Sequence, residues 1–182
     1  MVTFACGAFL ASFPYDMFND AQYFLEQARN SQDRQSECIR WRFLRASILF
    51  SLNSIEAYVN TLIIDLLRGW GLNEVAEEYP NTRLSWEKKI DIIIPWLTGK
   101  KVDKKQKFWG DFVDARKIRT ILVHYCGSAY SDVYDDNAKP GVNLLNAERA
   151  HGMVKDMVKH LCELVGQNSP SWVDQATSRT IE

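Results

Sequence analysis

Two residue types that handle phosphate groups stand close together in the second half of this sequence. Arg119 and His124 are separated by four residues in the stretch Arg-Thr-Ile-Leu-Val-His. A guanidinium keeps its charge at physiological pH and pairs with phosphate oxygens, whereas an imidazole exchanges a proton near neutrality. The pair therefore indicates a phosphate-handling site in which one residue holds charge and the other moves a proton.

The expected helix around this pair places Arg119 on an unusual side. On a helix over about residues 105–124, Arg119 projects within roughly 20° of Phe108. The apolar stripe that we expect to face the core consists of Phe108, Phe112, Ala115, Leu122 and Val123. Arg119 is thus expected to be a cation on the buried side, in need of an acceptor or a cavity. His124 lies about 140° from Arg119 on an ideal helix, so the two converge only if the helix unwinds or a second subunit supplies one of them.

A second charge occupies a core-facing position on an earlier helix. Glu56 falls inside an apolar arc of about 140° that runs from Ile48 to Leu67. Because a buried glutamate needs a partner, our hypothesis is that Glu56 and Arg119 meet or approach the same polar pocket. The alternative is that a buried Arg–Glu pair only fixes how the helices pack, without any chemistry.

The elements that must position these residues are nearly all helical. Apolar periodicity, glycines and prolines predict helices over about Asp16–Asn30, Asp33–Arg68, Leu84–Leu97, Lys105–His124 and Leu144–Val165. The fold class is therefore all-α, a single up-and-down-like helical bundle of about five helices. We divide the chain into an N-terminal hydrophobic segment with the first helix (1–30), the bundle (31–166) and a polar tail (167–182) in which Trp172 could dock.

Composition is that of an ordinary globular protein, but charge is unevenly distributed. The 182 residues are 46% hydrophobic and 25% charged, with a net charge of −1. From Arg83 to Arg119, eleven Lys and Arg stand against five Asp and Glu, a balance of +6, which leaves −7 on the remainder. This basic third can attract phosphate, or it can be a solvated face that keeps the protein in solution.

Cysteine spacing and hydropathy favour a reducing cytoplasm. The four cysteines form no C-x-x-C pair and lack zinc-finger spacing, so free thiols are the simplest account. The first thirteen residues are apolar but have no basic start, and we expect them to pack on the domain or on a partner. No run reaches the roughly 18 apolar residues needed to cross a bilayer, and no membrane partner is predicted.

Three segments together resemble the HEPN superfamily, small helical proteins many of which are ribonucleases. Arg119 to His124 matches the R-x4-6-H signature of that superfamily. The run Ile-Glu56-Ala-Tyr-Val-Asn60 is similar to the Ile-Glu-Ala-Tyr/Phe-x-Asn run common in its preceding long helix. The helix that begins at Leu84 also resembles the family, so the similarity covers about residues 40–165.

The resemblance implies a homodimer in which Arg and His from both subunits line a composite active site. It also implies metal-independent RNA cleavage without a cofactor, which yields a 2′,3′-cyclic phosphate and a 5′-hydroxyl. Arg119 would hold the scissile phosphate, His124 would act as general base or acid, and Glu56 would orient Arg119. The residues expected to support them are Thr120, Tyr125 and Asn60.

The same resemblance suggests a toxin, defence or RNA-processing module with RNA as substrate and a cognate inhibitor protein as a candidate partner. The residues that we expect to contact the RNA backbone are Lys100, Lys101, Lys104, Lys105, Lys107 and Arg116. Two departures stand out. Many active members have Asn, Asp or His where this chain has Thr120. Members inactivated by a nucleotidyltransferase partner have a tyrosine where this chain has Cys126.

Two other functions remain open from the residues. A non-catalytic helical RNA- or protein-binding module could retain the motif for its core structure. In that case, loss of Arg119 should chiefly lower stability. A thiol enzyme that uses Cys126 and His124 is the third reading, but no third group that would support such a pair is identifiable.

Overall fold

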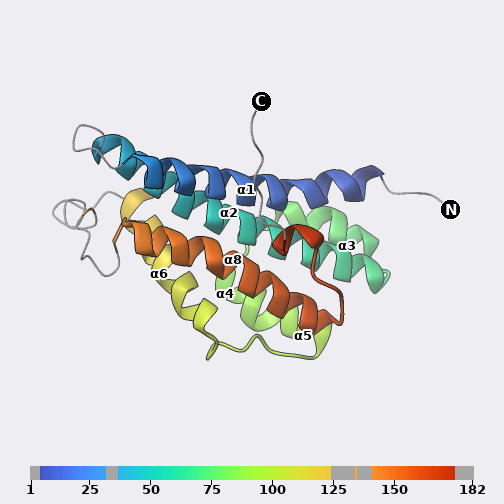
Figure 1. The fold of residues 1–182 in the computed structure, drawn as a ribbon. Coiled ribbons are helices and arrows are strands. Elements are labelled where there is room, and N and C mark those ends of the chain that lie inside the picture. The colour runs from blue at the N-terminus through green and yellow to red at the C-terminus, as the bar shows by residue number, and fades with distance from the viewer. Residues whose placement is uncertain (1–4, 32–36, 124–133, 135–140, 175–182) are drawn as a thin grey trace.

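The structure is a computed structural model that describes residues 5–31, 37–123, 134 and 141–174, with side chains from residue 13 onward. Helices make up most of this part of the chain, and it contains no strand. The all-α bundle predicted from the sequence is therefore confirmed (Figure 1).

Two long antiparallel helices, α1 (Ala5–Asn30) and α2 (Glu37–Gly69), form the body of the bundle. Figure 1 shows α1 lying along α2, with α8 (Leu144–Val165) on the opposite side and α6 (Lys107–Val123) beyond it. Three buried serines of α2 lie among its apolar residues, and one of them, Ser54, donates a hydrogen bond of 2.7 Å to the carbonyl of Pro14. Such small side chains let helix backbones approach closely.

Helix α1 starts well before the predicted position. The sequence placed its start near Asp16, but the helix begins at Ala5 and runs through Pro14. Proline has no backbone N–H to donate to the preceding turn, so Pro14 is an unfavourable residue inside this helix. Packing along α2 keeps the helix continuous, and residues of α1 and the bundle share one core.

The segment between α2 and α6 contains more helix than expected. Helix α3 (Asn73–Glu78) and a 3-10 turn (Tyr79–Asn81) were not predicted. The predicted helix over Leu84–Leu97 consists of α4 (Trp86–Lys88), a π-helical turn (Lys89–Ile93) and α5 (Ile94–Thr98). Pro95 has no N–H to continue the ordinary ladder, and a widened turn just before it is one way for a helix to absorb that loss.

Helix α8 has the predicted bounds, and the chain after it returns to the core. The Asn143 side chain accepts the Asn146 N–H at 2.8 Å, and Gly166 ends the helix in the left-handed conformation at φ 72°. Trp172 is buried with its ring centroid 5.2 Å from that of Phe18. The expectation that Trp172 could dock is therefore confirmed.

Two exposed tryptophans lie near the C-terminal end of α2. Trp70 and Trp96 are 63% and 61% exposed, and their rings stack with centroids 6.4 Å apart at an angle of 26°. Ile92, in the π-helical turn, is exposed as well. These aromatic side chains lie on different segments, the end of α2 and α5.

Helix α2 is long and apolar enough to cross a membrane, judged only by length and composition. Half of its most apolar 18-residue window is buried inside the bundle. A central helix surrounded by α1, α6 and α8 needs this composition for packing.

Candidate functional site

Arg119 and Glu56 meet across the gap between α6 and α2. A guanidinium nitrogen of Arg119 lies 3.5 Å from Glu56 Oε2, which confirms the predicted meeting of the two charges. The expectation that they would be buried is wrong, because their side chains are 46% and 39% exposed. The pair is therefore accessible to a ligand from solvent.

The orientation of α6 explains this exposure. Helix α6 packs mainly on α8 and less on α2, so its buried face turns toward α8. Ile118, which was not in the predicted stripe, is buried, whereas Val123, which was, is 60% exposed. The side of α6 that carries Arg119 faces an open pocket instead of a neighbouring helix.

This pocket, which we call the arginine pocket, has a volume of about 180 Å³ and opens between α2, α4 and α6. Its walls combine apolar side chains with charged ones, and they are Leu52, Glu56, Leu84, Ser85, Trp86, Phe112, Arg116 and Arg119. Trp86 and Phe112 form its floor as a ring pair with centroids 4.7 Å apart. Both arginines come from one face of α6, three residues apart.

The second arginine of the pocket is already paired. Arg116 donates to Glu87 at 2.6 Å, and this hydrogen bond lowers the pKa of Glu87 to about 2. The carboxylate of Glu87 is therefore charged across the whole physiological range. Because this contact is short and direct, Arg116 has less capacity to hold a ligand than Arg119 has.

Glu56 also forms an ion pair with a buried lysine that was not predicted from the sequence. Lys89 is only 6% exposed, and its Nζ lies 3.5 Å from Glu56 Oε1. One carboxylate thus lies between two cations, Lys89 and Arg119. A signal for Lys89 was present, because it stands three residues after Trp86 and one before Ile90, inside the apolar stripe of its helix.

The described residues that were predicted to support the site do not lie together in the structure. Thr120 is exposed on α6, and its hydroxyl donates to the Arg116 carbonyl at 3.0 Å. Asn60 lies one turn after Glu56 on α2 but faces a different cavity, where its Oδ1 accepts from the Tyr79 hydroxyl at 3.4 Å. His124 and Tyr125, predicted as catalytic and supporting residues, lie outside the described residues.

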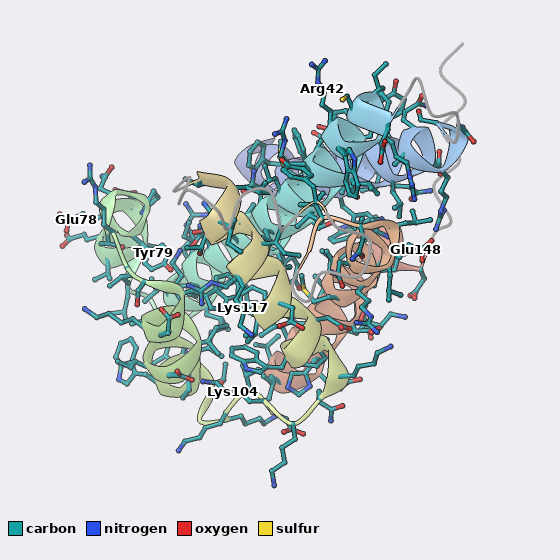
Figure 2. The ribbon with its side chains drawn as sticks, turned by 90° about the vertical axis from the view of Figure 1, so that its left-hand side faces the viewer. Arg42, Glu78, Tyr79, Lys104, Lys117 and Glu148 are labelled. Carbon is teal, nitrogen blue, oxygen red and sulfur yellow. The ribbon has the colours of Figure 1, made fainter. Side chains whose placement is uncertain are left out.

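The basic residues expected at an RNA backbone are unequally available. Lys104 pairs with Asp91 at 2.6 Å and lies over the Trp109 ring, and Lys100 donates to the Leu164 carbonyl at 3.0 Å. Figure 2 shows Lys104 in the segment that leads into α6 and Lys117 farther along that helix. The exposed residues Lys101, Lys105 and Lys107 complete the stretch.

Chemically, the arginine pocket suits an anion with a planar or apolar group attached. Arg119 has several N–H donors, and among the described residues the long contact with Glu56 is the one ion pair that engages them. Lys89 and Arg119 share a single carboxylate, so the cluster carries one uncompensated positive charge. A phosphate oxygen is a natural acceptor for it.

Comparison with known proteins does not assign this chain to a family. No protein-family model matches the sequence, and neither a curated protein nor a solved structure matches the chain. Within the described ranges, no group of three or more His, Cys, Asp and Glu side chains is arranged to hold a metal ion.

Proposed function

We propose that this protein is a metal-independent endoribonuclease of HEPN type. The observation that carries the proposal is the contact between Arg119 and Glu56 at the wall of an open pocket. The R-x4-H spacing supports it, since His124 directly follows the last described residue of α6. RNA cleavage needs these two parts, a fixed cation for the phosphate and a group that moves protons.

In the proposed reaction, the ribose 2′-hydroxyl attacks the adjacent phosphorus and the 5′-oxygen leaves. Arg119 holds the non-bridging oxygens, where negative charge grows in the transition state. Glu56 limits the rotation of the guanidinium, so it is a positioning residue. One His124 takes the proton from the 2′-hydroxyl, and the His124 of a second copy supplies the proton to the 5′-oxygen. The products are a 2′,3′-cyclic phosphate and a 5′-hydroxyl.

The second candidate function is a helical binding or assembly module, and the Lys89–Glu56–Arg119 array favours it. Three charged groups from three separate elements hold α2, the π-helical turn and α6 in register. A structural role of this kind needs no reaction. In that case the exposed basic residues would serve to bind RNA or an acidic protein surface.

The first experiment incubates RNA with wild type, Arg119→Ala and His124→Ala in EDTA and maps the new ends. We expect wild type to produce cyclic-phosphate ends and each variant to lose about a hundredfold or more in rate. Lys117→Ala is the matched control, because Lys117 is exposed on the same helix and pairs with Asp114 at 3.1 Å, away from the pocket.

The free energy of unfolding of the same variants distinguishes the two proposed functions. Glu56 is partly exposed and keeps Lys89 as a partner, so Arg119→Ala should lower the free energy of unfolding by less than about 1 kcal/mol. Folded variants that cut RNA as fast as wild type would sink the ribonuclease proposal. If no folded protein of the set cuts RNA, the binding module is favoured instead.

A further inference from the structure

A second, larger cavity is lined by Lys89, the buried partner of Glu56. Its volume is about 320 Å³, and it opens between α2 and the 3-10 turn that follows α3. Figure 2 shows Tyr79 on the side of this segment that faces α2, whereas Glu78 points outward. We call it the tyrosine pocket, and none of its lining residues belongs to the arginine pocket.

Most of the wall of the tyrosine pocket is apolar. Ala57 and Ile64 contribute from α2, and Pro80 contributes from the turn opposite. A dry apolar cavity of about 150 Å³ can hold a benzene ring, so this pocket has room for a ring and a short polar chain. Pockets of this size, mostly apolar with a few polar groups, are typical of small-molecule sites.

Two of the polar side chains that line the pocket, Lys89 and Asn60, have hydrogen-bond donors to offer a ligand. Lys89 lines it with an almost fully buried side chain, and its one partner among the described residues is Glu56, at the long distance of 3.5 Å. An ammonium has more than one N–H donor, so this contact leaves donors unused. Asn60 accepts the Tyr79 hydroxyl through its oxygen, which leaves its amide N–H groups as further donors.

The hydroxyl of Tyr79 stays protonated and acts as a neutral group. Burial, together with the nearby Glu56 carboxylate, raises the pKa of Tyr79 to about 12. The Tyr79 hydroxyl donates its hydrogen bond to Asn60 Oδ1, so Tyr79 orients that amide. The pocket therefore offers a ligand a cation and amide donors.

From this arrangement we propose that the tyrosine pocket binds a small monocarboxylate with an apolar, ring-sized body. The carboxylate accepts from Lys89 Nζ and from the Asn60 amide, and the body lies against Ala57, Ile64 and Pro80. The site does not depend on the ribonuclease proposal, because it uses none of the proposed catalytic groups directly.

The test titrates the full-length protein with 3-phenylpropionate and with its neutral amide, 3-phenylpropionamide, by ligand-observed NMR. We expect the acid to bind with a dissociation constant of about a millimolar or lower. The amide should bind at least about tenfold more weakly, because it lacks the charge-assisted contact with Lys89. Equal binding of acid and amide, or binding of neither, overturns the proposal.

Variants locate the site. Lys89→Met removes the ammonium and keeps the length of the side chain, so it should weaken the acid about tenfold and leave the amide unchanged. Lys88→Met is the matched control, since Lys88 is the exposed neighbour on the same segment and should change neither ligand. Undiminished acid binding to folded Lys89→Met contradicts the proposal.

Two further variants cover the remaining outcomes. Ala57→Phe places a ring inside the tyrosine pocket and should abolish binding of both ligands, which tests the site even if Lys89→Met does not fold. Arg119→Met should leave acid binding within about twofold of wild type. Loss of acid binding in Arg119→Met assigns the ligand to the arginine pocket and also overturns the proposal.

Discussion

At the scale of single residues, the carboxylate of Glu56 pairs with two cations, Lys89 and Arg119. Lys89 and Arg119 reach its two carboxylate oxygens from different elements, each at 3.5 Å. Arg119 is partly exposed and can be solvated without Glu56. Lys89 is buried, so the cost of losing the carboxylate falls mainly on Lys89.

We therefore predict that Glu56→Gln lowers the free energy of unfolding by about 2 kcal/mol, because it leaves a buried ammonium without a counter-charge. In a Lys89→Met background the same substitution should cost less than about 0.5 kcal/mol. Urea denaturation of the four proteins of this double-mutant cycle measures both numbers. Additive effects would mean that Lys89 does not depend on Glu56.

His151 on α8 is a second residue whose charge is set by burial. Its ring stacks on Phe18 with centroids 4.3 Å apart, and its Nε2 is buried without a hydrogen-bond partner among the described residues. Burial, together with the nearby cations Lys155 and Arg29, lowers the pKa of His151 to about 4. The folded protein thus holds this imidazole neutral.

A lowered histidine pKa makes stability fall in acid. In the unfolded chain His151 binds a proton below about pH 6.5, whereas in the folded protein it does so only near pH 4. The free energy of unfolding should therefore decline as the pH falls from about 6.5 to about 4. The contribution of His151 to that decline is about 3 kcal/mol. His151→Phe, which keeps the ring contact with Phe18, should flatten this part of the denaturation profile. An unchanged pH profile in that variant would contradict the prediction.

The sequence predicted charges and their partners better than it predicted burial. Arg119 and Glu56 each interrupt an apolar stripe, and a helical wheel is enough to show that. How far the neighbouring helix lies from that stripe is a tertiary property, and α6 turns Arg119 toward a pocket. Lys89 follows the same logic as Glu56, but a second lysine, Lys88, stands directly beside it in the same predicted helix.

At the scale of elements, helix ends with strong local signals were predicted well. Asn143 and Gly166 bound α8 through a side-chain cap and a left-handed glycine, and both are visible in the sequence. Helix α3 has no side-chain cap and only six residues, so it depends on packing of Ala76 against the core. The long α1 depends in the same way on α2, which outweighs the effect of Pro14.

The basic segment before α6 makes a prediction at this scale. If RNA binds there, the exposed residues Lys101, Lys105 and Lys107 should carry most of the phosphate contacts, because Lys100 and Lys104 have partners within the protein. Replacing all three with alanine should weaken RNA binding and reduce the slope of log K against log salt by about 2. Filter binding at several salt concentrations measures this slope, with Lys88→Ala as a control. A slope equal to that of wild type would place the RNA elsewhere.

At the scale of the whole molecule, the segment after α8 closes the core over α1. Trp172 packs near Tyr15, Phe18 and Tyr58, and Asp174 pairs with Lys159 at 2.7 Å. The division of the sequence at residue 167 left this segment as a polar tail. Its composition is polar, but a single tryptophan ties it to residues of two other helices.

We predict that Trp172→Ala lowers the free energy of unfolding by about 3 kcal/mol, since it removes a large buried ring between α1, α2 and α8. Trp70→Ala is the matched control, because Trp70 is 63% exposed and its loss should cost less than about 0.5 kcal/mol. Urea denaturation of both variants decides the point. Similar costs for the two would mean that Trp172 does not support the core.

The stacked pair of Trp70 and Trp96 provides an intrinsic spectroscopic probe of this part of the surface. Because both indoles face water, their fluorescence should lie at longer wavelength than that of buried Trp86 and Trp172, and iodide should quench it selectively. Two indoles 6.4 Å apart should also give a coupled signal in near-ultraviolet circular dichroism. Any molecule that covers this end of α2 will change both signals, so binding there can be followed without a label.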